Sequence, residues 1–189
     1  MTVPPLGPAD SFPSRLETER LTLRPLTMSD LDDVWAYASD PEVTRFTIFD
    51  YHTSRRTTEE WLKSALASSA GESFLFGVEH RQRGKIIGSC GIRAWNREYH
   101  LAEMGWALAR AYWNQGYATE AVGALIGFGF AHLKLNRMQA LCVPAHAASR
   151  RVMEKAGMKF EGILRQAGFF KSDYQDLAIY SILCSEWQG

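Results

Sequence analysis

The chain has 189 residues, enough for one domain with a sizeable core, and its 46% hydrophobic and 22% charged residues exclude a largely disordered protein. Lysine plus arginine equals aspartate plus glutamate, so a formal net charge of zero gives no general attraction to nucleic acid or an anionic membrane. We therefore expect a flexible, proline-rich lead at residues 1–15 and a single domain at residues 16–189, with neither nucleic acid nor membrane as a partner.

Cysteine usage and the N-terminus indicate the compartment. Cys90, Cys142 and Cys184 are an odd number without Cys-x-x-Cys spacing, and each lies in an apolar run. We expect them to be buried free thiols in reducing surroundings. No apolar segment flanked by lysines opens the chain and no run reaches the length of a membrane span, so a cytoplasmic location is predicted.

The periodicity of apolar residues predicts the elements in chain order. A first strand (20–26) is followed by a helix opening at Ser29, an irregular segment (42–53), a helix capped by Thr57 or Thr58, and three strands (73–79, 85–94 and 98–108). A helix that is apolar nearly all round (119–133), a strand (136–143) and a helix (147–157) come next. The last two strands (158–164 and 176–183) are expected to form a hairpin linked by an aromatic loop through Phe169, Phe170 and Tyr174.

This order predicts a mixed α/β fold. Its centre would be a twisted, mostly antiparallel sheet of roughly six to seven strands, flanked by about four helices. A strand–helix–strand crossover would surround the helix at 119–133.

The segment at 112–121, Tyr-Trp-Asn-Gln-Gly-Tyr-Ala-Thr-Glu-Ala, opens that helix. A turn of small residues before a helix leaves backbone N–H groups without intrahelical acceptors, and the positive end of the helix dipole lies at the same place. Such a turn binds anions, and a diphosphate suits it. We call residues 115–119 the cradle. It does not match the P-loop, because it lacks the lysine and the spacing of that motif. It does not match the dinucleotide fingerprint either, because it lacks the three spaced glycines.

Four motifs in order resemble the GNAT superfamily of N-acetyltransferases, and in particular its ribosomal-protein N-terminal acetyltransferase (RimJ/RimL-like) branch. They are the opening Arg-Leu-x-Leu-Arg-Pro at 20–25, the Ala-Glu-Met-Gly-Trp at 102–106 with the cradle, the helix at 148–158, and the closing segment at 176–183. The resemblance covers residues 16–187. It implies the GNAT fold, with the sheet splayed in its middle, and an acyltransferase enzyme.

The same resemblance implies acetyl-CoA as co-substrate, bound where the strand at 98–108 splays from the strand at 136–143. Backbone groups of one strand would pair with the pantetheine arm, and the cradle would hold the diphosphate. No metal is expected. The implied cofactor-binding residues are Trp106, Ala107, Leu108, Gln115, Gly116, Tyr117, Ala118, Thr119, His146 and Ser149.

Two catalytic residues are carried over from the family pattern. Glu103 would deprotonate the acceptor amine through water; its alternative is a strand residue paired with Arg93 or Arg97. Ser149 would protonate the leaving thiolate; its alternative is a helix N-cap. His146 departs from the usual asparagine, and is either a cofactor contact or proton donor, or an exposed loop residue.

The acceptor is expected to be a primary amine, first of all the α-amine of a protein or peptide N-terminus. The alternatives are a small amine such as an antibiotic, polyamine or amino acid, or a non-catalytic acyl-CoA-binding module. Segments 42–53 and 169–174 would form the acceptor wall, and the protein would be a monomer or homodimer.

Overall fold

The computed structural model of the protein describes residues 14–67 and 73–188, so most of the predicted lead lies outside the described residues. Its centre is an eight-stranded sheet in the order β1-β2-β3-β4-β5-β6-β8-β7. Neighbouring strands are antiparallel except for β5 and β6, which are parallel. The strands are β1 (Leu16–Glu17), β2 (Leu21–Arg24), β3 (Phe74–His80), β4 (Lys85–Asn96), β5 (Leu101–Leu108), β6 (Arg137–Cys142), β7 (Lys159–Phe170) and β8 (Asp173–Leu183).

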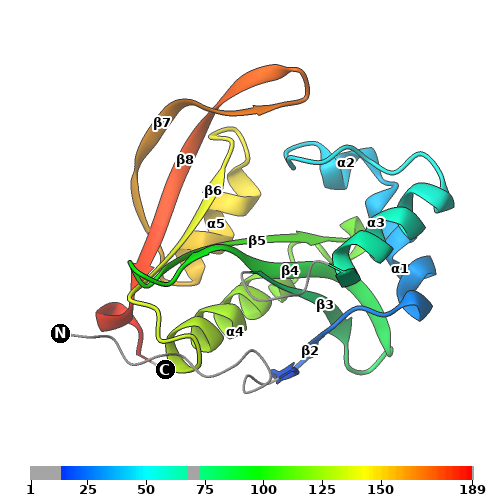
Figure 1. Ribbon diagram of the computed structural model, residues 1–189, viewed down its shortest axis with the longest axis horizontal. Coiled ribbons are helices and arrows are strands. Elements are labelled where there is room, and N and C mark those ends of the chain that lie inside the picture. Colours follow the sequence, from blue (N-terminus) through cyan, green and yellow to red (C-terminus); the bar gives the residue numbers. More distant parts are fainter. Residues whose placement is uncertain (1–13, 68–72, 189) are drawn as a thin grey trace.

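Helices pack on both faces of this sheet (Figure 1). The α-helices are α1 (Leu31–Ala38), α2 (Pro41–Thr44), α3 (Arg55–Ala67), α4 (Tyr117–Ala131) and α5 (Ala147–Lys155), and the short 3-10 helices are η2 (Met28–Asp30), η3 (Arg110–Tyr112) and η4 (Cys184–Glu186). The predicted mixed sheet flanked by helices is confirmed. Beyond the prediction there are the two-residue β1 and the four-residue α2.

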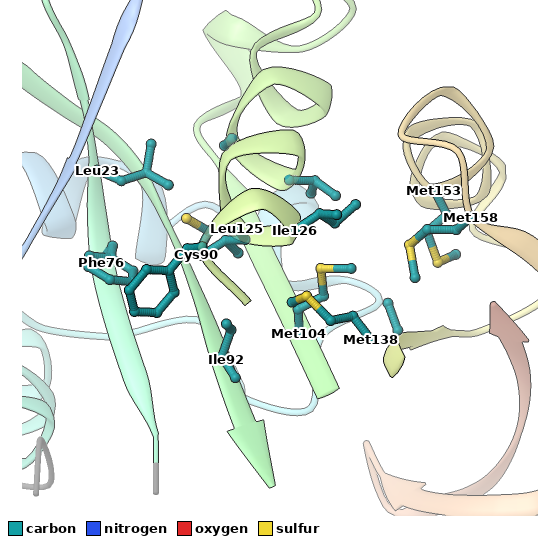
Figure 2. Packing of buried hydrophobic residues seen from close by; sticks show 14 of the residues in the cluster. Leu23, Phe76, Cys90, Ile92, Met104, Leu125, Ile126, Met138, Met153 and Met158 are labelled. Atoms are coloured by element: carbon teal, nitrogen blue, oxygen red, sulfur yellow. The ribbon is translucent and has the colours of Figure 1, made fainter. Parts of the chain in front are cut away.

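The main core lies between α4 and the sheet. Figure 2 shows Leu125 and Ile126 of α4 beside Cys90 and Ile92 of β4, and all four side chains are almost fully buried. Burial of each of the Leu and Ile side chains contributes about 1.5–3 kcal/mol relative to exposure. Four methionine side chains extend this core from β5 and β6 to the α5 region: Met104, Met138, Met153 and Met158. These contacts hold the N-terminal end of α4 at the middle of the sheet.

The two parallel strands, β5 and β6, part in the middle of the sheet. They pair only from Leu101 opposite Arg137 to Glu103 opposite Gln139, and beyond Glu103 the strands diverge, as Figure 1 shows. Five of the eight residues of β5 therefore follow the last paired position. The predicted splay is present, and it opens a wedge on the β6 side of β5.

Three local predictions were wrong. Helix η2 is capped by Thr27 and Asp30 rather than by Ser29, since the Thr27 backbone N–H donates to Asp30 at 2.7 Å. Helix α3 begins at Arg55, and the Ser54 hydroxyl accepts the Thr57 N–H, so neither predicted threonine is its cap. Cys184 is exposed in η4, whereas Cys90 and Cys142 are buried as predicted.

The last two strands form the predicted hairpin, but they continue through the segment that was expected to be an aromatic loop. Phe169 and Phe170 belong to β7 and Tyr174 to β8, with Phe169 opposite Tyr174. Lys171 and Ser172 form the turn, with φ values of 55° and 60°. Figure 1 shows the hairpin bending toward the segment after α2, and there the Lys171 Nζ donates at 2.7 Å to the Phe49 carbonyl and to Asp50.

Candidate functional site

The backbone at and just before the cradle is left-handed. Asn114 (φ 59°) and Gly116 (φ 83°) both lie in the αL region, and α4 begins at the next residue. The Gly116 carbonyl accepts the Glu120 N–H at 3.0 Å, so the N–H groups of residues 117–119 precede the first intrahelical bond. These three amides, at the positive end of a fifteen-residue helix, can bind an anion.

An ion pair that the motifs do not predict fixes the cradle to the segment between β1 and β2, at one edge of the sheet. Glu120, in the first turn of α4, accepts from the Arg20 Nε at 2.6 Å, the Arg20 backbone N–H at 2.8 Å and the Thr18 hydroxyl at 2.6 Å. The same guanidinium donates to the Gln115 carbonyl at 2.9 Å and lies 4.3 Å from the centre of the Tyr117 ring. We call this group the Arg20–Glu120 clamp.

The edge of β5 that faces the wedge carries backbone groups without a neighbouring strand. The Ala109 N–H donates to Ile87 of β4 at 2.8 Å, so strand alternation turns the backbone of Trp106 and Leu108 toward the wedge. The Leu108 carbonyl accepts the Trp113 indole N–H at 2.7 Å, which ties the cradle loop to the strand. The Trp106 backbone is left to pair with an extended ligand.

Two cavities meet at this wedge. The first, which we call the cradle cavity, has a volume of about 470 Å³ and is lined by the cradle, the start of α5 and the α2 segment. The second, the sheet cavity, has a volume of about 350 Å³ and lies over β3, β4 and β5. The two linings share six residues: Phe46, Thr47, Trp106, Ala107, His146 and Ser149. The two cavities are therefore adjacent at these residues.

The comparisons with known proteins agree with this geometry. The family model for the acetyltransferase (GNAT) domain matches residues 20–159. The chain belongs to the GNAT family. It is 33% identical over 175 residues to the uncharacterized N-acetyltransferase p20 of Bacillus licheniformis, a match covering 92% of this chain and 98% of p20.

Solved structures show the same family likeness. A GNAT-family acetyltransferase from Bacillus anthracis has a TM-score of 0.82 and 28% identity, covering 91% of this chain and 99% of that one. The spermidine N-acetyltransferase of Vibrio cholerae, solved in complex with CoA and spermine, has a TM-score of 0.75 and 22% identity, covering 89% and 98%. At that identity it shares the fold alone. As a GNAT protein, this chain is an N-acetyltransferase and hence an acyltransferase.

In this GNAT domain, Ser149 lies where the two cavities join. It is the third residue of α5 and is buried, so it is not the N-cap, a position that His146 occupies. Bonding from its hydroxyl would lower the pKa of the Cys142 thiol, which lines the sheet cavity with it. Burial raises the pKa of Cys142 above its ordinary value in spite of that bond and the nearby Arg150, so the thiol stays protonated at neutral pH. This favours the packing interpretation of Cys142.

His146 is a half-buried wall residue rather than an exposed loop residue. Its ring stacks on Phe46, with centroids 4.6 Å apart, and it lines both cavities. Burial lowers the pKa of His146 below its ordinary value, so the imidazole is neutral near pH 7. A neutral imidazole can donate one hydrogen bond to a ligand at the wedge.

Glu103 points to the face predicted for it but lies outside the lining of both cavities. It faces Arg93 across the β4–β5 pair, and the Arg93 Nε donates to its carboxylate at 2.8 Å. The side chain of Glu103 is 17% exposed. The geometry thus brings Ser149 and His146 together at the wedge, while Glu103 reaches it only through Arg93, which lines the sheet cavity.

The cofactor residues named from sequence fall into two groups. Those at Trp106 to Leu108 and at Gly116 to Thr119 line the cradle cavity. Gln115 does not line it; its side-chain amide donates to Ala111 and its carbonyl accepts from Arg20, while the neighbouring Asn114 lines the cavity instead. Sequence reasoning also missed three cations on the cavity wall, Arg45, Arg151 and Lys155. Arg151 and Lys155 lie within the helix motif at 148–158, whereas Arg45 lies outside all four motifs and had no signal.

Proposed function

We infer that the protein transfers the acetyl group of acetyl-CoA directly to a primary amine. The observation that carries this inference is the position of the cradle amides at one end of an unpaired strand edge, with a second cavity meeting that edge at Trp106 and Ser149. The cradle supports binding of the diphosphate, and the Trp106 backbone supports pairing with the pantetheine arm. Among the described lining residues of the cradle cavity, three cations and the single carboxylate of Glu42 favour an anionic ligand.

The transfer needs a neutral amine and a proton for the departing sulfur. The amine nitrogen attacks the thioester carbon, the tetrahedral oxyanion collapses, and the C–S bond breaks with its electron pair leaving on sulfur. Ser149 or the neutral His146, both at the junction, would pass a proton to that thiolate and regain one from solvent, and the amine would lose its own proton through water to Glu103. A Ser149→Ala variant that retains wild-type turnover would exclude Ser149 as the donor.

The first candidate acceptor is an N-terminal α-amine, as in the RimJ/RimL-like branch that the motifs resemble. An α-amine has an ordinary pKa of about 8, against about 10.4 for a lysine side chain, and so loses its proton far more readily at neutral pH. A small free amine is the second candidate. The sheet cavity of about 350 Å³ has the size of a small-molecule site, which favours it.

A thiol-release assay with acetyl-CoA tests the function. We expect release of free CoA thiol to require an added amine, and to saturate with peptides of varied N-terminal residue or with small amines, each matched in concentration. Mass spectrometry should find one acetyl group on the amine product. Tight CoA binding with no amine-dependent thiol release would instead indicate an acyl-CoA-binding module.

Replacing Glu103 with glutamine tests the predicted base. We expect kcat to fall on the order of tenfold, with little change in the Kd for CoA, because the carboxylate acts through water. This loss is smaller than the roughly 10²- to 10⁴-fold typical of a base in direct contact. The measurement is kcat against pH beside CoA titration by calorimetry. Arg93→Lys, which keeps a cation against Glu103, is the matched control, and full turnover of Glu103→Gln at every pH would remove Glu103 as the base.

A further inference from the structure

The sheet cavity has a floor of small residues. Gly91 lies opposite Gly105 and Ser89 opposite Ala107 in the β4–β5 register, and all four line the cavity. In antiparallel strands, positions two apart share a face, so these residues form one flat surface on the side of the sheet away from α4. Because these four side chains are small, this floor leaves room for a ligand to lie against the strands between Leu75 and Arg93, which line the same cavity.

Aromatic rings form the walls above that floor. Phe46 and Phe49 come from the segment after α2 and Trp61 comes from α3, and all three line the cavity. The Lys171 bridge to the Phe49 carbonyl and to Asp50 holds the wall that carries Phe49. Rings above a flat floor make an apolar slot, in which an apolar or aromatic group gains contact on both sides.

The charge of the slot opposes a second cation. Arg93 is the charged side chain among the described lining residues, and the carboxylate nearest to it, Glu103, is already bound by its guanidinium. An ammonium or guanidinium group carried on the acceptor would meet this arginine at close range, with no free carboxylate of the described lining to compensate for its lost water.

We propose that the sheet cavity selects primary amines carried on an uncharged apolar body, aromatic or branched aliphatic, and rejects amines that carry a second positive charge. This rests on the proposed acetyl transfer, because the amine must reach the junction at Trp106 and Ser149. The same chemistry is presented by a free amine and by the first residue of a peptide. The side chain of the acceptor would lie between the floor and the aromatic walls.

A series of α-amino amides tests the selection with one reacting group throughout. Glycinamide, leucinamide, phenylalaninamide and argininamide differ in the side chain, and the guanidinium of the last cannot be mistaken for an acceptor amine. We expect kcat/KM to rise about 10- to 200-fold from glycinamide to phenylalaninamide, the range that apolar pockets discriminate. Argininamide and spermidine should do no better than glycinamide. Hexapeptides beginning with the same residues distinguish a polypeptide end from a free amine as the source.

A charge variant of the slot gives the matched control. Ile48 lines the sheet cavity and is 62% exposed, so Ile48→Glu adds a carboxylate to the wall without burying it. It should raise the argininamide to phenylalaninamide ratio about tenfold. Ile163→Glu, at a 44% exposed position of β7 outside both cavities, should leave the ratio unchanged.

Binding measured without turnover separates the two ways in which the idea can fail. Calorimetry of each amide into the CoA-saturated protein reports on the slot even if no acetyl group moves. Ordered binding with phenylalaninamide strongest, but no thiol release from acetyl-CoA, would overturn the proposed transfer and support the slot. Turnover with argininamide or spermidine preferred, or with a flat series, would support the transfer and overturn the slot.

Discussion

Replacing Gly116 with valine is expected to weaken the affinity for CoA by about 10- to 100-fold. Gly116 has φ 83°, and a Cβ built there would lie 3.3 Å from the Arg20 guanidinium. A β-branched residue in this conformation costs roughly 1–3 kcal/mol, so the turn must change shape to accept it. Any such change would alter the direction of the N–H groups of residues 117–119, which we propose hold the diphosphate. Isothermal titration with CoA measures the loss.

A second glycine separates the loss of the cradle from general backbone strain. Gly84, in the turn between β3 and β4, has φ 61° and no atom within 4 Å of a built Cβ. Gly84→Val should therefore lower the melting temperature by an amount similar to Gly116→Val and leave CoA affinity unchanged. Wild-type CoA affinity in Gly116→Val would count against the cradle as the phosphate site.

The parts of the site that were predictable from sequence have local signals. The cradle could be located because Gly116 stands directly before an apolar helical run, and both features are visible within about fifteen residues. The face of Glu103 follows from strand alternation with Ala102 and Met104, which are buried on the other side. The splay of β5 from β6 was expected only through the resemblance, and the three-residue register shows it.

The hairpin of the last two strands was predicted, but its continuation to a tight turn at residues 171–172 could not be, because this part lacks the usual signals. Its turn residues, Lys171 and Ser172, both have positive φ, a conformation that sequence normally announces with Asn-Gly or Asp-Gly. β7 is also an edge strand with most residues exposed, so burial imposes no alternation on it. The register shift between Leu164 and Gly168 breaks the period further.

The Arg20–Glu120 clamp was missed for a different reason. Its two members lie a hundred residues apart and are joined only because β2 and the start of α4 meet in the folded chain. In one sequence, Glu120 is simply an acid in the first turn of a helix, where it is favourable in any case. The same holds for Arg93, whose partner follows from register and not from spacing.

Removing the charge of the clamp is expected to cost stability and to flatten its acid dependence. Burial alone would raise the pKa of Glu120, but the bonds from Thr18 and Arg20 outweigh it, so the folded-state pKa lies below the ordinary 4.5. A depressed pKa stabilises the fold above the ordinary value, and this contribution is lost as the pH falls through the folded-state pKa. Glu120→Gln should lower the free energy of unfolding at pH 7 by about 1–2 kcal/mol. The loss is no larger because the Arg20 side chain is 39% exposed, and solvent partly screens the ion pair.

Urea unfolding of the wild type and the variant from pH 7 down to about pH 3 measures the difference in their free energies of unfolding. This difference should shrink toward the acid end, because Glu120 is then protonated and as uncharged as the glutamine that replaces it. Glu59→Gln, which breaks an exposed pair with Lys63 on α3, is the matched control and should change nothing measurable. A constant difference at every pH would mean that Glu120 acts by packing and not by charge. Because Arg20 also binds the Gln115 carbonyl, Glu120→Gln should weaken CoA binding as well, which Glu59→Gln cannot do. Loss of stability with unchanged CoA affinity would therefore show that the clamp holds the sheet edge without shaping the cradle.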